Sequence, residues 1–416
     1  MLEALAGNLT WLKFPLALAT SLLSVAVLFR VQGRAFEAAF LRNAVVGITL
    51  AKLLGCVIVY ALAPMDGLGS DAQRHYLPQA LRVLDGEIPH RDFTTSYGPL
   101  FPYLIAPGLL VWRSVGSIVF TMLLVEAATI AIYALRSRRS GFSGHWRVAF
   151  LYVSSPISWY WVGAVGTNSV VIACFAMLGL ALADVRRDVA SGVAAALGLL
   201  LSKITMILAW PAVLLFQRRG ILSRGIPVAV VLAAAAALAR VDVDVTARAV
   251  DYEFRATSGN LWFLLSMLGR FELNSAAVKQ LSMASLLVAA APVCLFFLVG
   301  RVRDGRGGFD SSAALLSVVN LIFMVLSYKT YPWYWAGFLV FTLHTLLADG
   351  TLRLRPLIPL MFLGAVTQLE PRLWMLVRSS QPGLLSSTGG LLFALDVAML
   401  VAILYWAVLC LRRARL

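Results

Sequence analysis

The stretch SAALLSVVNLIFMVLSYKTYPWYWAGFLVFTLHTLLA, residues 312–348, decides the fold class of this chain. It holds two apolar runs, 312–328 and 333–348, separated only by Lys-Thr-Tyr-Pro. Lys329 is its only residue with a fixed charge. A helix that crosses a bilayer needs about 20 predominantly apolar residues. Runs of this order recur along the chain, so the sequence predicts an all-α, polytopic membrane protein.

The composition of the whole chain supports this class. Of its 416 residues, 60% are hydrophobic and 13% are charged, and the mean hydropathy is +0.84. Soluble domains carry about 25% charged residues. A soluble domain could not bury this much apolar surface, so lipid must be the solvent for most of the chain.

The charges and cysteines fit a membrane protein as well. The net charge of +15 comes from basic clusters between apolar runs, as at 136–139 and 412–415. Such clusters are typical of cytoplasmic loops, so we expect no nucleic-acid partner. The cysteines lie in or beside apolar runs without metal-ligand spacing and are interpreted as small hydrophobic residues. They are Cys56, Cys174, Cys294 and Cys410.

About 13 spans are expected, within about two, and 101–112 is a further apolar candidate. We predict a single domain, 1–416, in which 64–100 is a long outward loop. The expected spans are 12–30, 43–63, 117–135, 148–164, 168–184, 189–201, 204–216, 226–240, 281–300, 312–328, 333–348, 356–369 and 388–410.

Basic residues predict which connections are cytoplasmic. The connections 64–100, 165–167, 241–280, 329–332 and 370–387 then share the opposite, outward face, where a functional surface is expected. The N-terminus would lie outside and the C-terminus inside. The connections expected to be cytoplasmic are 30–42, 136–147, 185–188, 217–225, 301–306, 351–355 and 411–416.

The segment 189–216 runs between two basic connections and has Ser202-Lys203 in its middle. This pattern predicts two short helices that turn near Lys203. Short, broken helices in membrane proteins are usually tolerated because they line a cavity.

The segment 67–104 is the least bilayer-like part of the chain. Its middle predicts an amphipathic helix on the membrane surface, which Pro78 would kink or begin and Gly86 would stop. The apolar face of this helix would hold Tyr76, Leu77, Ala80, Leu81 and Leu84.

This segment also carries a family resemblance. It reads D-x-x-x-x-Y from Asp71 to Tyr76, then GEIPHRDF at 86–93 and YGPL at 97–100. In this it resembles the first outward loop of GT-C glycosyltransferases that use polyprenyl-phosphate sugars. Among these it looks like the bacterial polyprenol-phosphate-mannose-dependent mannosyltransferases and the relatives of the protein O-mannosyltransferases. The segments VGTN (165–168) and LLSKITMILAWP (200–211) are similar to further parts of that family.

The resemblance implies that Asp71 is the catalytic residue, which activates the acceptor hydroxyl as a general base. It also implies a polyprenyl-phosphate-linked sugar as the donor. The chain departs from family members with a paired acidic motif, because Ala72 and Gln73 follow Asp71. The role of a divalent metal therefore stays open. The alternative for Asp71 is a helix N-cap. Asp92 and Asp66 are the reserve acidic residues, and Asp92 could instead pair with Arg91 or cap a turn.

Further residues are candidates for binding the lipid phosphate or the sugar. Lys203 lies deep in an apolar stretch, where a cation is unfavourable by about 2.5–3.5 kcal/mol, so it is a candidate for the phosphate. The alternative is a lysine that snorkels to the interface. The segment 327–335 crowds aromatic residues around Lys329; it predicts either a sugar-binding rim or an interfacial aromatic belt. The remaining candidates are Arg74, His75, Tyr97 and Tyr331.

Other signals do not support nucleotide or zinc chemistry. Asp242-Val243-Asp244 is a D-x-D without a strand–helix pattern around it, so we interpret it as loop polarity. No phosphate-binding glycine motif is present, and the four histidines are scattered without an H-E-x-x-H motif. No cofactor is therefore predicted.

The sequence thus predicts an inverting glycosyltransferase, with a weak preference for mannose, in the inner membrane of a bacterium with its site facing outward. Its acceptor would be a glycan, a glycolipid or a protein. The alternatives are a secondary transporter or lipid-linked-sugar flippase, and an oligosaccharide polymerase or ligase with a lipid-diphosphate donor.

Overall fold

The fold is that of a computed structural model. Between the gaps in its description, the residues form helices and turns, and no β-strand occurs among them. The all-α class is therefore confirmed for this part of the chain. The structure describes residues 2–62, 70–139, 142, 144–216, 220–241, 260–269, 280, 284, 288, 308–327, 330–348, 352–368 and 387–414.

Five of the described helices are long and apolar enough to cross a membrane. The protein is therefore membrane-embedded, as its composition predicts. These five helical stretches are Phe14–Val31 in α1 (Leu2–Val31), Glu37–Leu62 (α2), Val115–Arg139 (α5), Phe309–Leu326 (α14) and Gly390–Arg413 in α17 (Ser387–Ala414).

Further helices complete the bundle, and the expected spans within the described residues overlap single helices or pairs of short ones. The expected span 281–300 lies almost entirely outside the described residues. The other described α-helices are α3 (Leu77–Leu84), α4 (Phe101–Val111), α6 (His145–Ser154), α7 (Ser169–Asp184), α8 (Asp188–Leu200), α9 (Trp210–Leu214), α10 (Ile221–Val241), α12 (Leu261–Met267), α15 (Leu339–Leu347) and a helix at 358–368.

The turn predicted near Lys203 is confirmed. Helix α8 ends at Leu200, and the chain turns back into a 3₁₀-helix, η3 (Ile204–Ala209), which leads into α9. Both η3 and α9 pack against α8. The turn is made at 201–202, and Lys203, with an extended backbone (φ −154°, ψ 169°), leads into η3.

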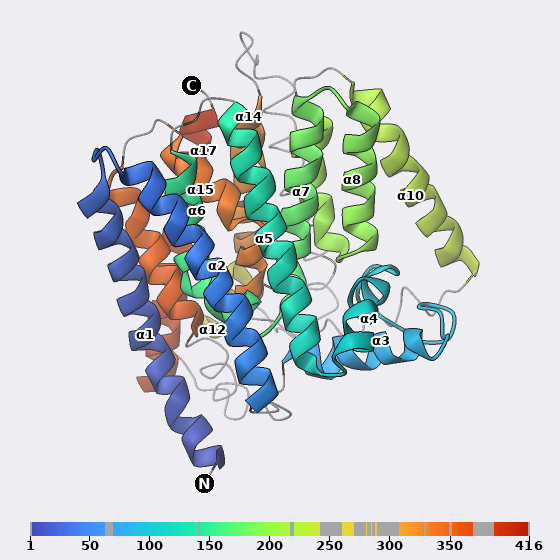
Figure 1. The fold of residues 1–416 in the computed structure, drawn as a ribbon, viewed down its shortest axis with the longest axis horizontal. Helices are drawn as coiled ribbons and strands as arrows, with labels where there is room; N and C mark the ends of the chain where they lie inside the picture. Colours follow the sequence, from blue (N-terminus) through green and yellow to red (C-terminus); the bar gives the residue numbers. More distant parts are fainter. Residues whose placement is uncertain are drawn as a thin grey trace.

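Ion pairs gather several helix ends at what we call the basic end of the bundle. Arg147 (α6) pairs with Glu37 (α2), and Arg136 (α5) pairs with Asp184 (α7) at 3.2 Å. Arg224 (α10) pairs with Asp188 (α8). The connections that carry these arginines were expected to share one face, and the structure groups them. Figure 1 shows the C-terminus at this end and the N-terminus at the opposite end.

The opposite end carries the first loop (Figure 1). A π-helix, η1 (Ala72–Tyr76), leads into α3, and α4 follows after an irregular stretch. Pro78 lies in the first turn of α3, and Gly86 ends the helical region with a φ of +88°. Tyr76 and Ala80 are fully buried, as the amphipathic pattern predicts. Leu84, the last residue of the helix, is 38% exposed.

Candidate functional site

Asp71 stands directly before η1, in the N-cap position, but its side chain makes no capping hydrogen bond. Ser70 takes that role instead. The Gln73 N–H donates to the Ser70 hydroxyl at 3.3 Å, and the Arg74 N–H donates to the Ser70 carbonyl at 2.9 Å. Asp71 therefore lacks the side-chain hydrogen bond that defines an N-cap, and its partly buried carboxylate does not stabilise the start of the helix in this way.

Tyr76 lies at the centre of a cluster of aromatic rings next to Asp71. Its ring packs edge-on against Tyr97 at 5.0 Å and Phe101 at 4.9 Å. Complete burial raises the pKa of Tyr76 well above its usual range, and the negative charge of Asp71 adds to this rise. Tyr76 therefore stays a neutral hydroxyl at physiological pH.

Tyr97 links this cluster to Lys203. The Lys203 ammonium lies 5.8 Å from the centre of the Tyr97 ring and 5.0 Å from the centre of the Tyr334 ring. A cation at these distances from ring faces is attracted by their negative π-density. The aromatic pair therefore holds the positive charge of Lys203 at the end of the bundle where the first loop lies.

The first loop is also bonded directly to the turn that carries Lys203. The Leu100 N–H donates to the Leu200 carbonyl at 2.9 Å, and the Gly98 N–H donates to the Ser202 carbonyl at 2.8 Å. A Cβ atom on Gly98 would lie 2.2 Å from the Leu200 carbonyl oxygen. Only glycine permits this approach, which explains the glycine of the YGPL segment.

The segment 163–168 also contacts η1. The Asn168 N–H donates to the Tyr76 hydroxyl at 3.4 Å. Gly166 has a φ of +70°, and a Cβ atom there would meet Val119 at 3.0 Å and Ala72 at 3.6 Å. This segment therefore packs against the residue that follows Asp71, and its glycine is required by both conformation and contact.

The aromatic segment completes the surroundings of Lys203. Tyr331 stacks on Trp333 at 4.1 Å and meets Tyr334 edge-on at 5.7 Å. Trp333 also contacts Trp161, at 5.3 Å. Lys329 lies outside the described residues. We call the meeting place of 71–76, 97–100, 163–168, 200–203 and 331–334 the Asp71 site.

Arg74 and His75 are exposed side chains on η1, one helical turn from Asp71. Asp92 has a structural role in the same loop. It forms an ion pair with Arg91 at 2.8 Å and accepts a hydrogen bond from the Ile88 N–H at 2.8 Å, which closes a turn. Asp66 and the Asp242–Asp244 pair lie outside the described residues. Within the described ranges, no group of three or more His, Cys, Asp and Glu side chains is arranged to hold a metal ion.

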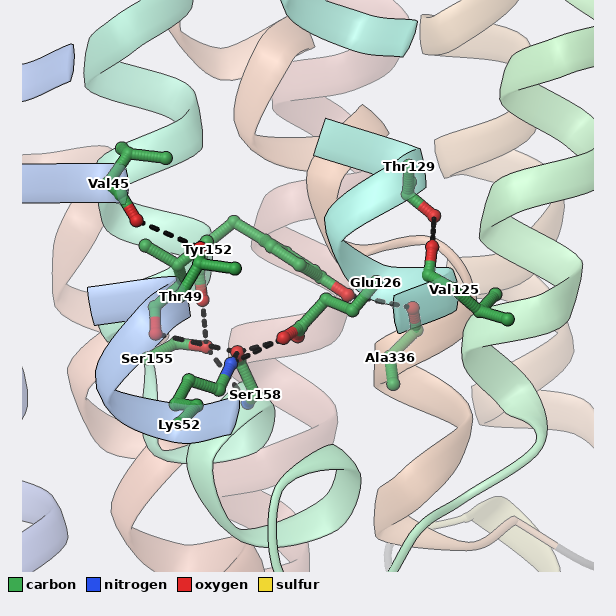
Figure 2. A network of polar contacts seen from close by, with 11 residues as sticks. Val45, Thr49, Lys52, Val125, Glu126, Thr129, Tyr152, Ser155, Ser158 and Ala336 are labelled. Carbon is green, nitrogen blue, oxygen red and sulfur yellow. Dashed lines mark hydrogen bonds and ion pairs between the residues drawn. The ribbon is translucent and has the colours of Figure 1, made fainter. Parts of the chain in front are cut away.

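The sequence reasoning missed a buried polar network in the middle of the bundle. Figure 2 shows Lys52 of α2, Glu126 of α5 and Ser158 pointing toward one another. Lys52 donates to both Glu126 and Ser158, and the Ser158 hydroxyl donates to the second oxygen of Glu126 at 2.6 Å. All three are at most 3% exposed. The sequence did contain a signal for this network, because Lys52 and Glu126 are each an isolated charged residue within an expected span.

No family model, curated protein or solved structure matches the chain.

Proposed function

We propose that the protein is an inverting glycosyltransferase of the GT-C type, which moves a sugar from a polyprenyl-phosphate carrier to an acceptor hydroxyl. The observation that supports this most is the composition of the Asp71 site. The three segments that resemble the family, which are the first loop, 165–168 and 200–203, are distant in sequence and are joined there by direct contacts.

In the proposed reaction, the Asp71 carboxylate takes the proton of the acceptor hydroxyl. At the same time, the oxygen of that hydroxyl bonds to the anomeric carbon of the sugar. The bond from that carbon to the phosphate oxygen breaks, and its electron pair leaves with the polyprenyl phosphate. Attack from the side opposite the phosphate inverts the anomeric configuration. Asp92 is already engaged by Arg91 and the Ile88 N–H, and these contacts lower its pKa to about 2.

The leaving phosphate is stabilised by fixed positive charge rather than by a proton. We assign this role to Lys203, with Arg74 and Lys329 as further cations and His75 as a further hydrogen-bond donor. Tyr97 and Tyr331 would contact the sugar, since aromatic rings offer a flat apolar face. We assign no metal and no cofactor. We propose polyprenyl-phosphate mannose as the donor and a glycan, glycolipid or protein as the acceptor.

We also propose about 13 spans in a bacterial inner membrane, with the Asp71 site on the outward face and the basic end in the cytoplasm. The separation of the basic connections from the first loop supports this orientation.

A transfer assay in liposomes tests the proposal. Purified protein would receive labelled polyprenyl-phosphate mannose and a bacterial membrane extract as acceptor, with wild type compared with Asp71→Asn and Asp85→Asn. Asp85 is an exposed residue at the end of α3 and serves as the matched control. We expect transfer by wild type and Asp85→Asn, and loss in a folded Asp71→Asn.

Equal transfer by Asp71→Asn would remove this carboxylate from the chemistry. A parallel reaction with the lipid-diphosphate sugar separates the proposal from a polymerase or ligase. Transfer from the diphosphate donor alone would overturn our choice of donor.

A further inference from the structure

The charged pair Lys52–Glu126 is not explained by the Asp71 site. Together with Ser158 it forms a closed triangle of hydrogen bonds in which the ammonium, the hydroxyl and both carboxylate oxygens have partners. Ions inside a membrane protein are unfavourable, and they are usually associated with function. The question is which part of the protein needs this pair.

The triangle joins α2 and α5 to a π-helix, η2 (Ile157–Val162), which contains Ser158. π-Helices are rare and frequently lie at functional sites. This one brings Trp161 against Trp333 of the aromatic segment, at 5.3 Å. The triangle is thus one short helix away from the aromatic rings of the Asp71 site.

The chain that leaves η2 runs directly into the Asp71 site. The Tyr60 hydroxyl, also on α2, donates to the Ala164 carbonyl at 2.8 Å. Gly166 follows and lies against Val119 of α5 and Ala72, the neighbour of Asp71. The helices that hold the charged pair therefore also hold the segment that packs beside Asp71.

We propose that Lys52 and Glu126 are positioning residues: through Ser158 they fix η2 and thereby set the place of 163–168 against the start of η1. The effect on activity rests on the proposed function, whereas the effect on the structure does not.

A purely stabilising role fits this pair less well. Well-packed apolar residues of similar volume in place of a buried ion pair often leave stability unchanged or raise it, whereas loss of one partner lowers it strongly. The two hydroxyls beside the pair keep an acceptor when both charges are removed. Ser158 has a second acceptor in the Val153 carbonyl at 3.4 Å, and the Tyr152 hydroxyl donates to the Ala336 carbonyl at 3.5 Å. Mutations can therefore separate the effect of the pair on the stability of the protein from its effect on the position of η2 and 163–168.

The test compares wild type, the double variant Lys52→Met/Glu126→Leu and the single variant Ser158→Ala, in nanodiscs. The single variant keeps the charged pair and removes the bonds of the Ser158 hydroxyl, both to the pair and to the Val153 carbonyl. Thermal unfolding measures stability, and hydrogen–deuterium exchange reports the backbone at 160–168 and 72–76. The control is Arg147→Met/Glu37→Gln, which removes an ion pair between α6 and α2 at the basic end.

We expect the double variant to unfold near the wild-type temperature. Both test variants should exchange at 160–168 and 72–76 at least about tenfold faster than wild type, because opening of this region becomes easier. The control should leave exchange there unchanged. In the transfer assay, kcat should fall about 10–100-fold with KM nearly unchanged, since the reacting groups are misplaced while the binding groups remain.

Wild-type exchange at 160–168 and 72–76 in a folded double variant, or in Ser158→Ala, would overturn the proposal. If the double variant does not fold, Ser158→Ala decides. If wild type shows no transfer, the proposed function fails, but the exchange data still judge the positioning role.

Discussion

The backbone N–H of Gly98 donates a 2.8 Å hydrogen bond to the carbonyl oxygen of Ser202, and this bond ties the first loop to the turn that carries Lys203. Gly98→Ala should break it, because the new Cβ would lie 2.2 Å from a backbone oxygen. We expect a loss of about 1–3 kcal/mol in unfolding free energy. Gly55→Ala in α2 is the control, since its Cβ would meet nothing within 4 Å. Thermal unfolding in detergent measures both, and equal stability would refute the close approach.

Substitutions of Lys203 test its proposed role in binding the lipid phosphate. Lys203→Met removes the positive charge beside Tyr97 and Tyr334, whereas Lys203→Arg keeps it. We expect kcat/KM to fall about 100-fold in the methionine variant and much less in the arginine variant, because the leaving phosphate needs a fixed cation. Binding of polyprenyl phosphate, compared with polyprenol, shows whether the phosphate is the group affected. Equal binding by both variants would exclude the role.

Gly166 and Gly33 form a matched pair. Their φ angles are +70° and +73°, but a Cβ on Gly166 meets Val119 and Ala72 while one on Gly33 meets nothing within 4 Å. Alanine at either position should lower the unfolding free energy by about 1–2 kcal/mol through backbone strain. Only Gly166→Ala should also reduce transfer, because the tight contact of the new Cβ with Val119 of α5 shifts 163–168, which packs beside Ala72. Loss of transfer in both variants would show that strain, not the contact, is responsible.

Asp92 should titrate with a pKa of about 2, mainly because Arg91 and the Ile88 N–H hydrogen-bond to its charged form. An unperturbed aspartate titrates near 3.9. The folded-state pKa is the lower one, so the stabilising effect of this turn is fully present above about pH 4 and is lost as the pH falls through about 2. NMR titration of ¹³C-labelled aspartate, assigned with Asp92→Asn, measures this. Arg91→Gln should raise the midpoint, and an unchanged midpoint would refute the cause.

The helices follow the apolar runs closely, because the thickness of the bilayer fixes the length of apolar sequence that a helix needs. The reversal near Lys203 was predictable for the same reason, since a charge interrupts a run too short for two full spans. The start of α3 was visible in Pro78, and its end in Gly86.

The pairing of Lys52 with Glu126 could not be predicted in the same way. Each ion is visible in the sequence, but several apolar runs contain an acidic residue, among them those with Asp184 and Asp396. The sequence does not give the depth and rotation of each helix, and these decide which charges meet. The role of Gly166 was hidden too, because its contact with Val119 joins two elements distant in the chain.

The π-helix at Ile157–Val162 has a consequence for insertions and deletions. A π-turn contains one residue more than the α-turn that it replaces. Deletion of one residue there would restore regular α-helical bonding and leave a sound helix. Every later side chain, Trp161 included, would rotate by about 100° around the axis. Homologous chains one residue shorter at this point would therefore keep the bundle but present a different surface to the first loop.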